Sequence, residues 1–350
     1  MTNKRYLIYG VITALLVLLF YVQFRTWTRF NWGMFFTQTR DVSILHIVLG
    51  IAYIYFAYVL RAVRWKILLR PVKRTSTASL LSPTIVGFTG LSLLGRPGEI
   101  IRPYLIARKV DLSFSSQMAV WTVERIFDFG GFAVLLISAI FLSSALQTLP
   151  YYSKFRELGL FLIVFVAALA IIAAAIHRWG EGMASLAERV FGGHAAGLGQ
   201  KIAARVREFR SGLNTIHGFS EFVQLTAVSI FMWFIIALAY YEVTKSYGAV
   251  LHIAFPEVFL LMAASMAGSM VQLPGVGGGS QLATISTLQH VFRASQELSA
   301  SCGILLWLVT FMSIIPLGLL IAHRERVSLR GLSKASQKEE LVQDGAAASK

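Results

Sequence analysis

Apolar runs of membrane-spanning length recur throughout the sequence. A helix needs roughly 20 apolar residues, at about 1.5 Å each, to cross about 30 Å of hydrocarbon. Six runs approach or exceed this length: 6–24, 43–60, 118–141, 158–177, 222–245 and 301–322. The first follows Lys4 and Arg5 but continues into an aromatic-rich loop without a small-residue cleavage site, so we expect a retained helix. The sequence therefore predicts an all-α integral membrane protein.

Composition excludes the usual soluble classes. The chain is 56% hydrophobic and only 14% charged, with a mean hydropathy of +0.66, whereas about a quarter of an ordinary soluble domain is charged. The net charge of +15 is spread between apolar blocks, which argues against nucleic-acid binding and for a role in topology. The single cysteine, Cys302, excludes a disulfide framework and any cysteine-based metal site.

Two further apolar segments, 78–109 and 257–293, are interrupted by glycine and proline. Backbone that leaves the helix at membrane depth has unpaired N–H and C=O groups, so it persists only inside protein or beside a wet cavity. We therefore expect two broken, re-entrant hairpins in addition to about six full transmembrane helices.

Basic residues predict the orientation. The stretches 61–74 and 178–210 and the tail after His323 each contain six Lys or Arg, more than the opposite loops. By the positive-inside rule these segments are cytoplasmic, so both termini lie inside a multi-pass protein of the cell (inner) membrane. This assignment works when each broken segment returns to the side from which it entered.

The order of the segments suggests an inverted repeat. Span, span, hairpin and span occur in residues 1–157 and again in 158–330, with three full spans per half, so the halves are opposite in orientation. Paired broken helices in such repeats mark substrate sites in transporters. We therefore expect one transmembrane domain, 1–330, and a disordered tail, 331–350.

A polar segment at about 180–217 joins the two halves. Its apolar residues recur at helical spacing, at Ile202, Val206, Phe209 and Leu213. This pattern predicts a cytoplasmic amphipathic helix on anionic headgroups. A connector packed on the protein's own loops is the alternative.

The first break contains ionisable residues three positions apart: Arg96, Glu99 and Arg102, with Gly98 between them. A charge at the bilayer centre costs about 2.5 to 3.5 kcal/mol on insertion scales, so each needs a partner. A helix start facing the membrane interior, with arginine beside it, is suited to a phosphate or carboxylate. The alternative is an ion pair of Glu99 in a cytoplasmic surface loop.

Three more charges, Glu124, Arg125 and Asp128, lie in the first third of an apolar span. Arg125 and Asp128 are spaced to neutralise each other, which leaves Glu124 needing a cation from the preceding hairpin, Arg96 or Arg102. A structural ion-pair network between hairpin and span is one interpretation. A set of carboxylates that balances the arginines until an anionic substrate binds is the other, and the two are compatible.

The second break is a glycine-rich run whose candidate substrate-binding residues are Pro274, Gly275, Gly277, Gly278, Gly279 and Ser280. Glycine permits close approach of another backbone or a ligand, and Ser280 is expected to cap the following helix. The Lys-Ser/Thr of a nucleotide-binding loop is absent. The alternative is a tight turn between two packed half-helices.

Nothing in the sequence supports an enzyme. No two of the seven histidines are three or four residues apart, and no Gly-x-Ser-x-Gly or Asp-x-Asp string occurs. We expect no catalytic residue, no metal and no cofactor.

The string from Gly95 to Pro103, the later Glu124-Arg125 with Asp128, and the final Pro-Gly-Val-Gly-Gly-Gly resemble the lysylphosphatidylglycerol synthase transmembrane-region family, also called flippase-like. The resemblance covers nearly the whole chain and implies a stand-alone member without the aminoacyl-transfer domain to which this module can be fused. Members often carry an acidic residue after the glycine run, where this chain has Ser280 and Gln281, so we expect a different substrate or coupling.

Together these features predict a lipid transporter. It would bind an anionic phospholipid or a polyprenyl-phosphate-linked lipid and move it between leaflets, with Arg96 and Arg102 taking the phosphate and Glu99, Glu124 and Asp128 holding those arginines in the empty state. The alternatives are a transporter of a small soluble anion and a non-transporting accessory subunit that partners a lipid-modifying enzyme.

Overall fold

The computed structural model describes residues 31–95, 98–190, 199–200, 203, 206–207, 218–270, 272–273 and 277–325. Several predictions fall outside these residues: the apolar run 6–24, Arg96, Pro274, Gly275, the tail 331–350, and Ile202, Phe209 and Leu213 of the amphipathic pattern.

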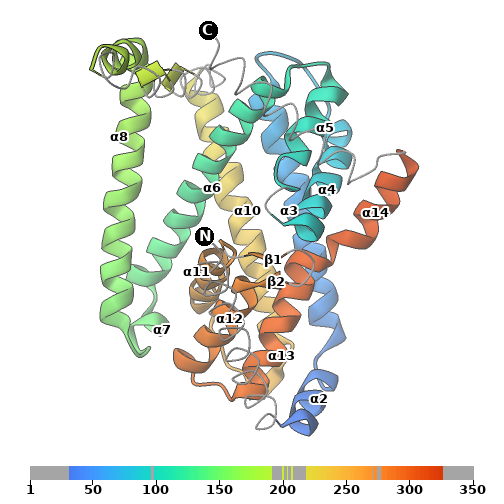
Figure 1. Ribbon diagram of the computed structural model, residues 1–350. Helices are drawn as coiled ribbons and strands as arrows, with labels where there is room; N and C mark the ends of the chain where they lie inside the picture. The colour runs from blue at the N-terminus through green and yellow to red at the C-terminus, as the bar shows by residue number, and fades with distance from the viewer. Residues whose placement is uncertain are drawn as a thin grey trace, which may run out of the picture.

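The described chain is a bundle of helices (Figure 1). The first part contains α2 (Trp32–Arg40), α3 (Ile44–Leu69), α4 (Thr77–Leu94), α5 (Ile101–Val110), α6 (Phe114–Leu142), α7 (Ser144–Gln147) and α8 (Tyr152–Val190). The second contains α10 (Phe219–Lys245), η2 (Gly248–Val250), η3 (Phe255–Glu257), α11 (Val258–Gly268), β1 (Gln272–Leu273), β2 (Gly277–Gly278), α12 (Gly279–His290), α13 (Gln296–Trp307), η4 (Leu308–Met312) and α14 (Ile314–Arg324).

The all-α membrane class is confirmed. Among the described residues, five segments are long and apolar enough to cross a membrane: Ile44–Leu69, Thr77–Leu94, Phe114–Leu142, Phe219–Lys245 and Gln296–Arg324. The predicted run 158–177 lies within α8, a single helix of 39 residues. The predicted boundary between the two halves also falls inside α8, and the inverted repeat stays a prediction.

The first hairpin is built by close packing of α5 against α4. Gly95 ends α4 with a positive φ of 69°, which reverses the chain before α5 begins at Ile101. A Cβ added at Gly87 would lie 2.8 Å from the Cα of Arg102, and one at Gly90 would lie 2.6 Å from the Cδ1 of Ile101. Hence α5 folds back along α4. Because α4 is itself one of the five segments long and apolar enough to cross a membrane, re-entrance of this hairpin stays a prediction.

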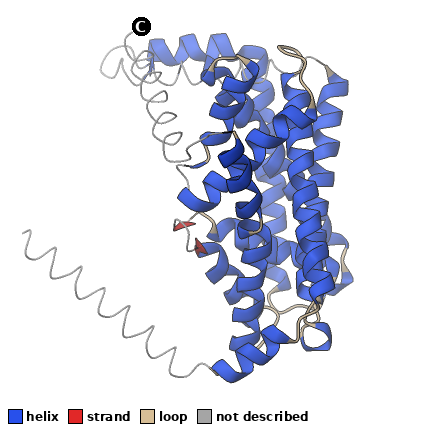
Figure 2. Cartoon of the chain, turned by 90° about the vertical axis from the view of Figure 1, so that its right-hand side faces the viewer, coloured by secondary structure: helices blue, strands red, loops and turns tan. Residues whose placement is uncertain are grey.

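The second hairpin pairs α11 with α12. At its tip β1 and β2 form a two-stranded antiparallel ladder, which pairs Gln272 with Gly278 and Leu273 with Gly277 (Figure 2). The predicted capping role of Ser280 is wrong. The N-cap of α12 is Gly278, whose N–H donates to Oε1 of Gln281 at 3.1 Å, and Ser280 lies buried in the first turn. A glycine with φ of 111° fits this turn where serine would be strained.

The last membrane segment bends at a π-helical turn, η4, between α13 and α14. Pro316 has no N–H to donate to the carbonyl of Met312, so one helical hydrogen bond is missing there. The N–H of Ser313 donates to the carbonyl of Leu308, five residues earlier, at 2.8 Å, which is the spacing of a π-helix. Hydroxyls of neighbouring helices satisfy carbonyls beside the turn: Ser92 donates to Phe311 O at 2.9 Å and Tyr55 donates to Ser313 O at 2.8 Å. The turn is thus anchored to α4 and α3.

Substituting Gly87 tests the packing of the first hairpin. Gly87→Ala should lower the free energy of unfolding by about 1 to 3 kcal/mol, because the new methyl group overlaps Arg102 at a backbone contact. Gly130→Ala in α6 is the control, since nothing lies within 4 Å of its added Cβ. Thermal unfolding in detergent measures both, and an equal effect of the two substitutions would contradict this packing.

Candidate functional site: a buried arginine and carboxylate cluster

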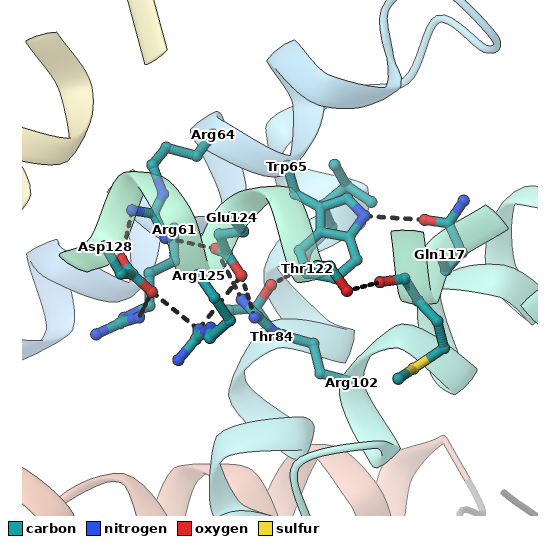
Figure 3. A network of polar contacts seen from close by, with 12 residues as sticks. Arg61, Arg64, Trp65, Thr84, Arg102, Gln117, Thr122, Glu124, Arg125 and Asp128 are labelled. Carbon is teal, nitrogen blue, oxygen red and sulfur yellow. Dashed lines mark hydrogen bonds and ion pairs between the residues drawn. The ribbon is translucent and has the colours of Figure 1, made fainter. Parts of the chain in front are cut away.

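Six charged side chains from three helices meet in the interior (Figure 3). Arg61 and Arg64 come from α3, Arg102 from the first turn of α5, and Glu124, Arg125 and Asp128 from α6. Helical spacing brings each group together, since residues three or four apart share a face. We call these six residues the charge cluster.

Glu124 is the centre of the charge cluster. Its side chain is fully buried and accepts from two arginines on different helices. Nη2 of Arg64 donates to Oε1 at 2.6 Å, while Arg102 donates to both oxygens, with Nη1 at 3.1 Å from Oε1 and Nη2 bound to Oε2. A carboxylate bound on both sides in this way has the charge-assisted, bidentate geometry that is strongest for arginine.

Asp128 completes the pairing one turn along α6. Nη1 of Arg64 donates to Oδ1 of Asp128 at 2.5 Å and to the hydroxyl of Ser229 in α10 at 3.1 Å. Arg64 therefore bridges two carboxylates and ties α3 to α6 and α10. Its side chain is 1% exposed, so these contacts replace most of its hydration, although its Nε has no acceptor among the described residues.

The other two arginines are held less completely. Nη2 of Arg125 lies 3.0 Å from Oδ2 of Asp128 and 3.4 Å from Oε2 of Glu124, and its side chain is 33% exposed. Arg61 lies 3.9 Å from Oδ2 of Asp128, beyond hydrogen-bonding distance, and no hydrogen bond of its guanidinium is seen among the described residues. These are the cations of the cluster with spare donors.

Aromatic rings cover the guanidinium groups. Arg102 lies 4.4 Å from the ring of Trp65 and 5.0 Å from that of Phe88, which also contacts Arg61 at 4.7 Å. Trp65 is fully buried and donates to Oε1 of Gln117 at 2.9 Å. Cation–π contacts partly replace lost hydration without neutralising the charge.

The charge cluster is therefore electropositive. Four arginines face the two carboxylates of the cluster, an excess of two positive charges that the carboxylate of Glu99, at the wall of a pocket beside it, offsets in part. Burying unpaired charge is expensive, so such an excess favours the arrival of an anion.

A small pocket of about 40 Å³ gives access to this excess charge. Its wall includes Phe88 and Leu91 of α4, Glu99 and Arg102 of the hairpin, and Trp121 and Arg125 of α6. We call it the polar pocket. Arginine donors in a fork geometry beside an apolar wall suit a phosphate or carboxylate group.

The structure brings together most of the residues predicted for the first hairpin and the third span. Arg102, Glu124, Arg125 and Asp128 are in the charge cluster, and Glu99 lines the polar pocket. Gly98 is in the hairpin turn, where an added Cβ would meet the backbone of Gly90 and Leu91.

The glycine-rich residues occupy a different place. Gly277, Gly278, Gly279 and Ser280 lie in the second hairpin and, among the described residues, share no hydrogen bond or ion pair with the charge cluster.

Sequence reasoning missed Arg61 and Arg64. Both were assigned to a cytoplasmic loop, but α3 continues to Leu69 and carries Arg61, Arg64 and Lys66 with it. The available signal was apolar periodicity after Leu60, because Ala62, Trp65 and Leu68 lie three apart between the charges.

Comparison with known proteins shows the family of the chain. The family model of the lysylphosphatidylglycerol synthase TM region matches residues 7–329. The chain belongs to this family. The match confirms the resemblance carried by the two charged motifs, and it identifies a membrane domain consistent with a flippase-like role. A search of curated proteins gives no match.

Removing the central carboxylate tests the charge cluster. Glu124→Gln should destabilise the protein by about 3 to 5 kcal/mol, because it leaves the buried Arg64 and Arg102 short of a counter-charge. Glu157→Gln, which breaks an exposed pair with Lys154, should cost about 1 kcal/mol or less. Chemical denaturation in detergent compares the two, and a Glu124→Gln effect no larger than the control would show that the buried pairs do not stabilise the fold.

Proposed function

We propose that this protein binds an anionic lipid, a phospholipid or a polyprenyl-phosphate-linked lipid, and moves it between the leaflets of the cell (inner) membrane. The observation that carries the proposal is the excess of buried arginine beside the polar pocket. The family supports it, since its name refers to the membrane region of a lysylphosphatidylglycerol synthase, a protein named for a phospholipid.

The incompletely held arginines would take the anionic group first. Arg125 lines the polar pocket, and about a third of its side chain is exposed. Arg102 lines the same pocket but is bound by Glu124. A phosphate entering the pocket adds acceptors for Arg125 and competes with Glu124 for Arg102. Binding would thereby weaken the ion pair that joins α5 to α6. Movement of the hairpin would then depend on whether the ligand is bound.

The orientation with cytoplasmic termini belongs to the same proposal. Three of the six basic residues first counted in 61–74 are part of α3, which leaves Arg70, Lys73 and Arg74 in the turn after it. The stretch 178–210 and the tail keep their basic excess, so the positive-inside rule still favours the predicted orientation. No catalytic step, metal or cofactor is assigned.

Arg125→Gln tests the role of the charge cluster in transport. It removes a pocket cation but leaves Glu124 paired with Arg64 and Arg102, so folding should persist. We expect transfer of fluorescent phosphatidylglycerol across proteoliposomes to fall about tenfold or more, the effect of losing a hydrogen bond between charged groups. Arg156→Gln on the exposed face of α8 is the matched control.

Other outcomes assign other functions. Equal lipid transfer by wild type and Arg125→Gln contradicts the proposal. Uptake of a soluble anion that depends on Arg125, without lipid transfer, identifies the soluble-anion transporter. No transport, together with co-purification of a lipid-modifying enzyme by both variants, identifies the accessory subunit.

A further inference from the structure

A second cavity, of about 140 Å³, adjoins the polar pocket at Phe88. Its wall is mainly apolar and includes Ala57 and Tyr58 of α3, Trp233 of α10 and Met262 of α11. Ser92 at the end of α4, Ser269 after α11 and Thr310 of the π-helical turn also line it. The cavity therefore lies where the ends of α4 and α11 approach the bend of the last membrane segment. We call it the apolar cavity.

The apolar cavity and the polar pocket share part of their walls. Phe88 and Leu91 line both of them. The Phe88 ring contacts both Arg61 at 4.7 Å, which lines the apolar cavity, and Arg102 at 5.0 Å, which lines the polar pocket. A ligand that reaches the arginines thus comes within one side chain of an apolar space.

Unused donors lie at the wall of the apolar cavity. The guanidinium of Arg61 has only its 3.9 Å ion pair with Asp128 and the Phe88 ring, and the buried Nε1 of Trp233 has no acceptor among the described residues. A buried donor without an acceptor is costly. The occupant that satisfies this wall carries oxygen acceptors at one end and hydrocarbon at the other.

We infer that the apolar cavity is the hydrocarbon subsite of the same ligand, and that this ligand is an amphiphile whose anionic group lies at the arginines. The inference rests on the proposed function and deepens it, because it assigns the first part of the lipid chain to a place in the protein. Phe88 is then the side chain between headgroup and chain. A soluble anion would use the polar pocket alone.

The size of the apolar cavity fits this role. Apolar cavities of about 150 Å³ stay dry and bind a group the size of benzene, so this one has room for a short length of chain. Each methylene moved out of water strengthens binding by about fourfold. A substitution that removes the space for a few methylene groups should therefore lower the affinity for the lipid by a measurable factor.

Ala57→Leu fills the apolar cavity without removing a polar contact, since Ala57 is buried at its wall. Ala52→Leu is the matched control, because Ala52 is exposed five residues earlier on the same helix. Ser269→Leu fills the apolar cavity from α11 and provides an independent second variant. The probes are phosphatidylglycerol and glycerophosphoglycerol, its headgroup without chains, titrated against the detergent-solubilised protein by native mass spectrometry and calorimetry.

The expected result is selective. Wild type and Ala52→Leu bind phosphatidylglycerol more tightly than glycerophosphoglycerol, while Ala57→Leu and Ser269→Leu lose about tenfold or more in affinity for the lipid and bind glycerophosphoglycerol as before. Retained headgroup binding shows that the variants are folded.

Three results would overturn the inference: equal affinity of wild type for both probes, unchanged lipid binding in both filled variants, or equal loss of both probes in them. Lipid binding that Arg125→Gln abolishes and both filled variants keep would leave the proposed function intact while removing the hydrocarbon subsite. Lipid binding unaffected by Arg125→Gln but lost in the filled variants would instead contradict the proposed role of the charge cluster.

Discussion

The fold depends on the pairing of one buried carboxylate, Glu124, with arginines from two other helices. In a membrane span an unpaired charge is expensive, so Arg64 of α3 and Arg102 of α5 are each stable only when α6 is in place. The first hairpin is thus held by a contact that no single helix can make. Close glycine packing of α4 against α5 then fixes the position of Arg102 in the first turn of α5.

Within the charge cluster, some arginines stabilise the fold and others are available to a ligand. Arg64 is enclosed by Glu124, Asp128 and Ser229, so both of its terminal nitrogens are committed to structural contacts. Arg125 and Arg61 are on the edges of the cluster, one at the polar pocket and one at the apolar cavity, and their pairing with Asp128 is partial. An excess of cations arranged in this way keeps its fold without a ligand and still gains from an anion.

Much of this arrangement was predictable from the sequence, for identifiable reasons. Hydropathy located four of the five membrane-length segments among the described residues, whereas the fifth, Thr77–Leu94, was assigned to a broken hairpin. The glycine and proline breaks located both hairpins, and the need of Glu124 for a cation pointed to Arg96 or Arg102, of which Arg102 is its partner. Arg61 and Arg64 were missed because a count of basic residues assigns every arginine near the end of a span to a loop. The count does not distinguish an arginine buried in a helix from one exposed in a loop. The capping residue of α12 and the π-helical turn depend on backbone angles that neighbouring helices impose, which local pattern does not encode.

The partners of the two helices of the first hairpin, α4 and α5, suggest how binding would be transmitted. On one side α4 is locked to α14, where an added Cβ at Gly318 would meet the Cβ of Thr89 at 2.6 Å, and Ser92 holds the π-helical turn. On the other side α5 is held to α6 through the ion pair of Arg102 and Glu124. An anion that competes for Arg102 acts on this ionic contact and leaves the packed contact unchanged. Movement would then be concentrated in α5 and the turn before it, beside the pocket through which the headgroup enters, while the wall formed by α4 and the bent last segment stays in place.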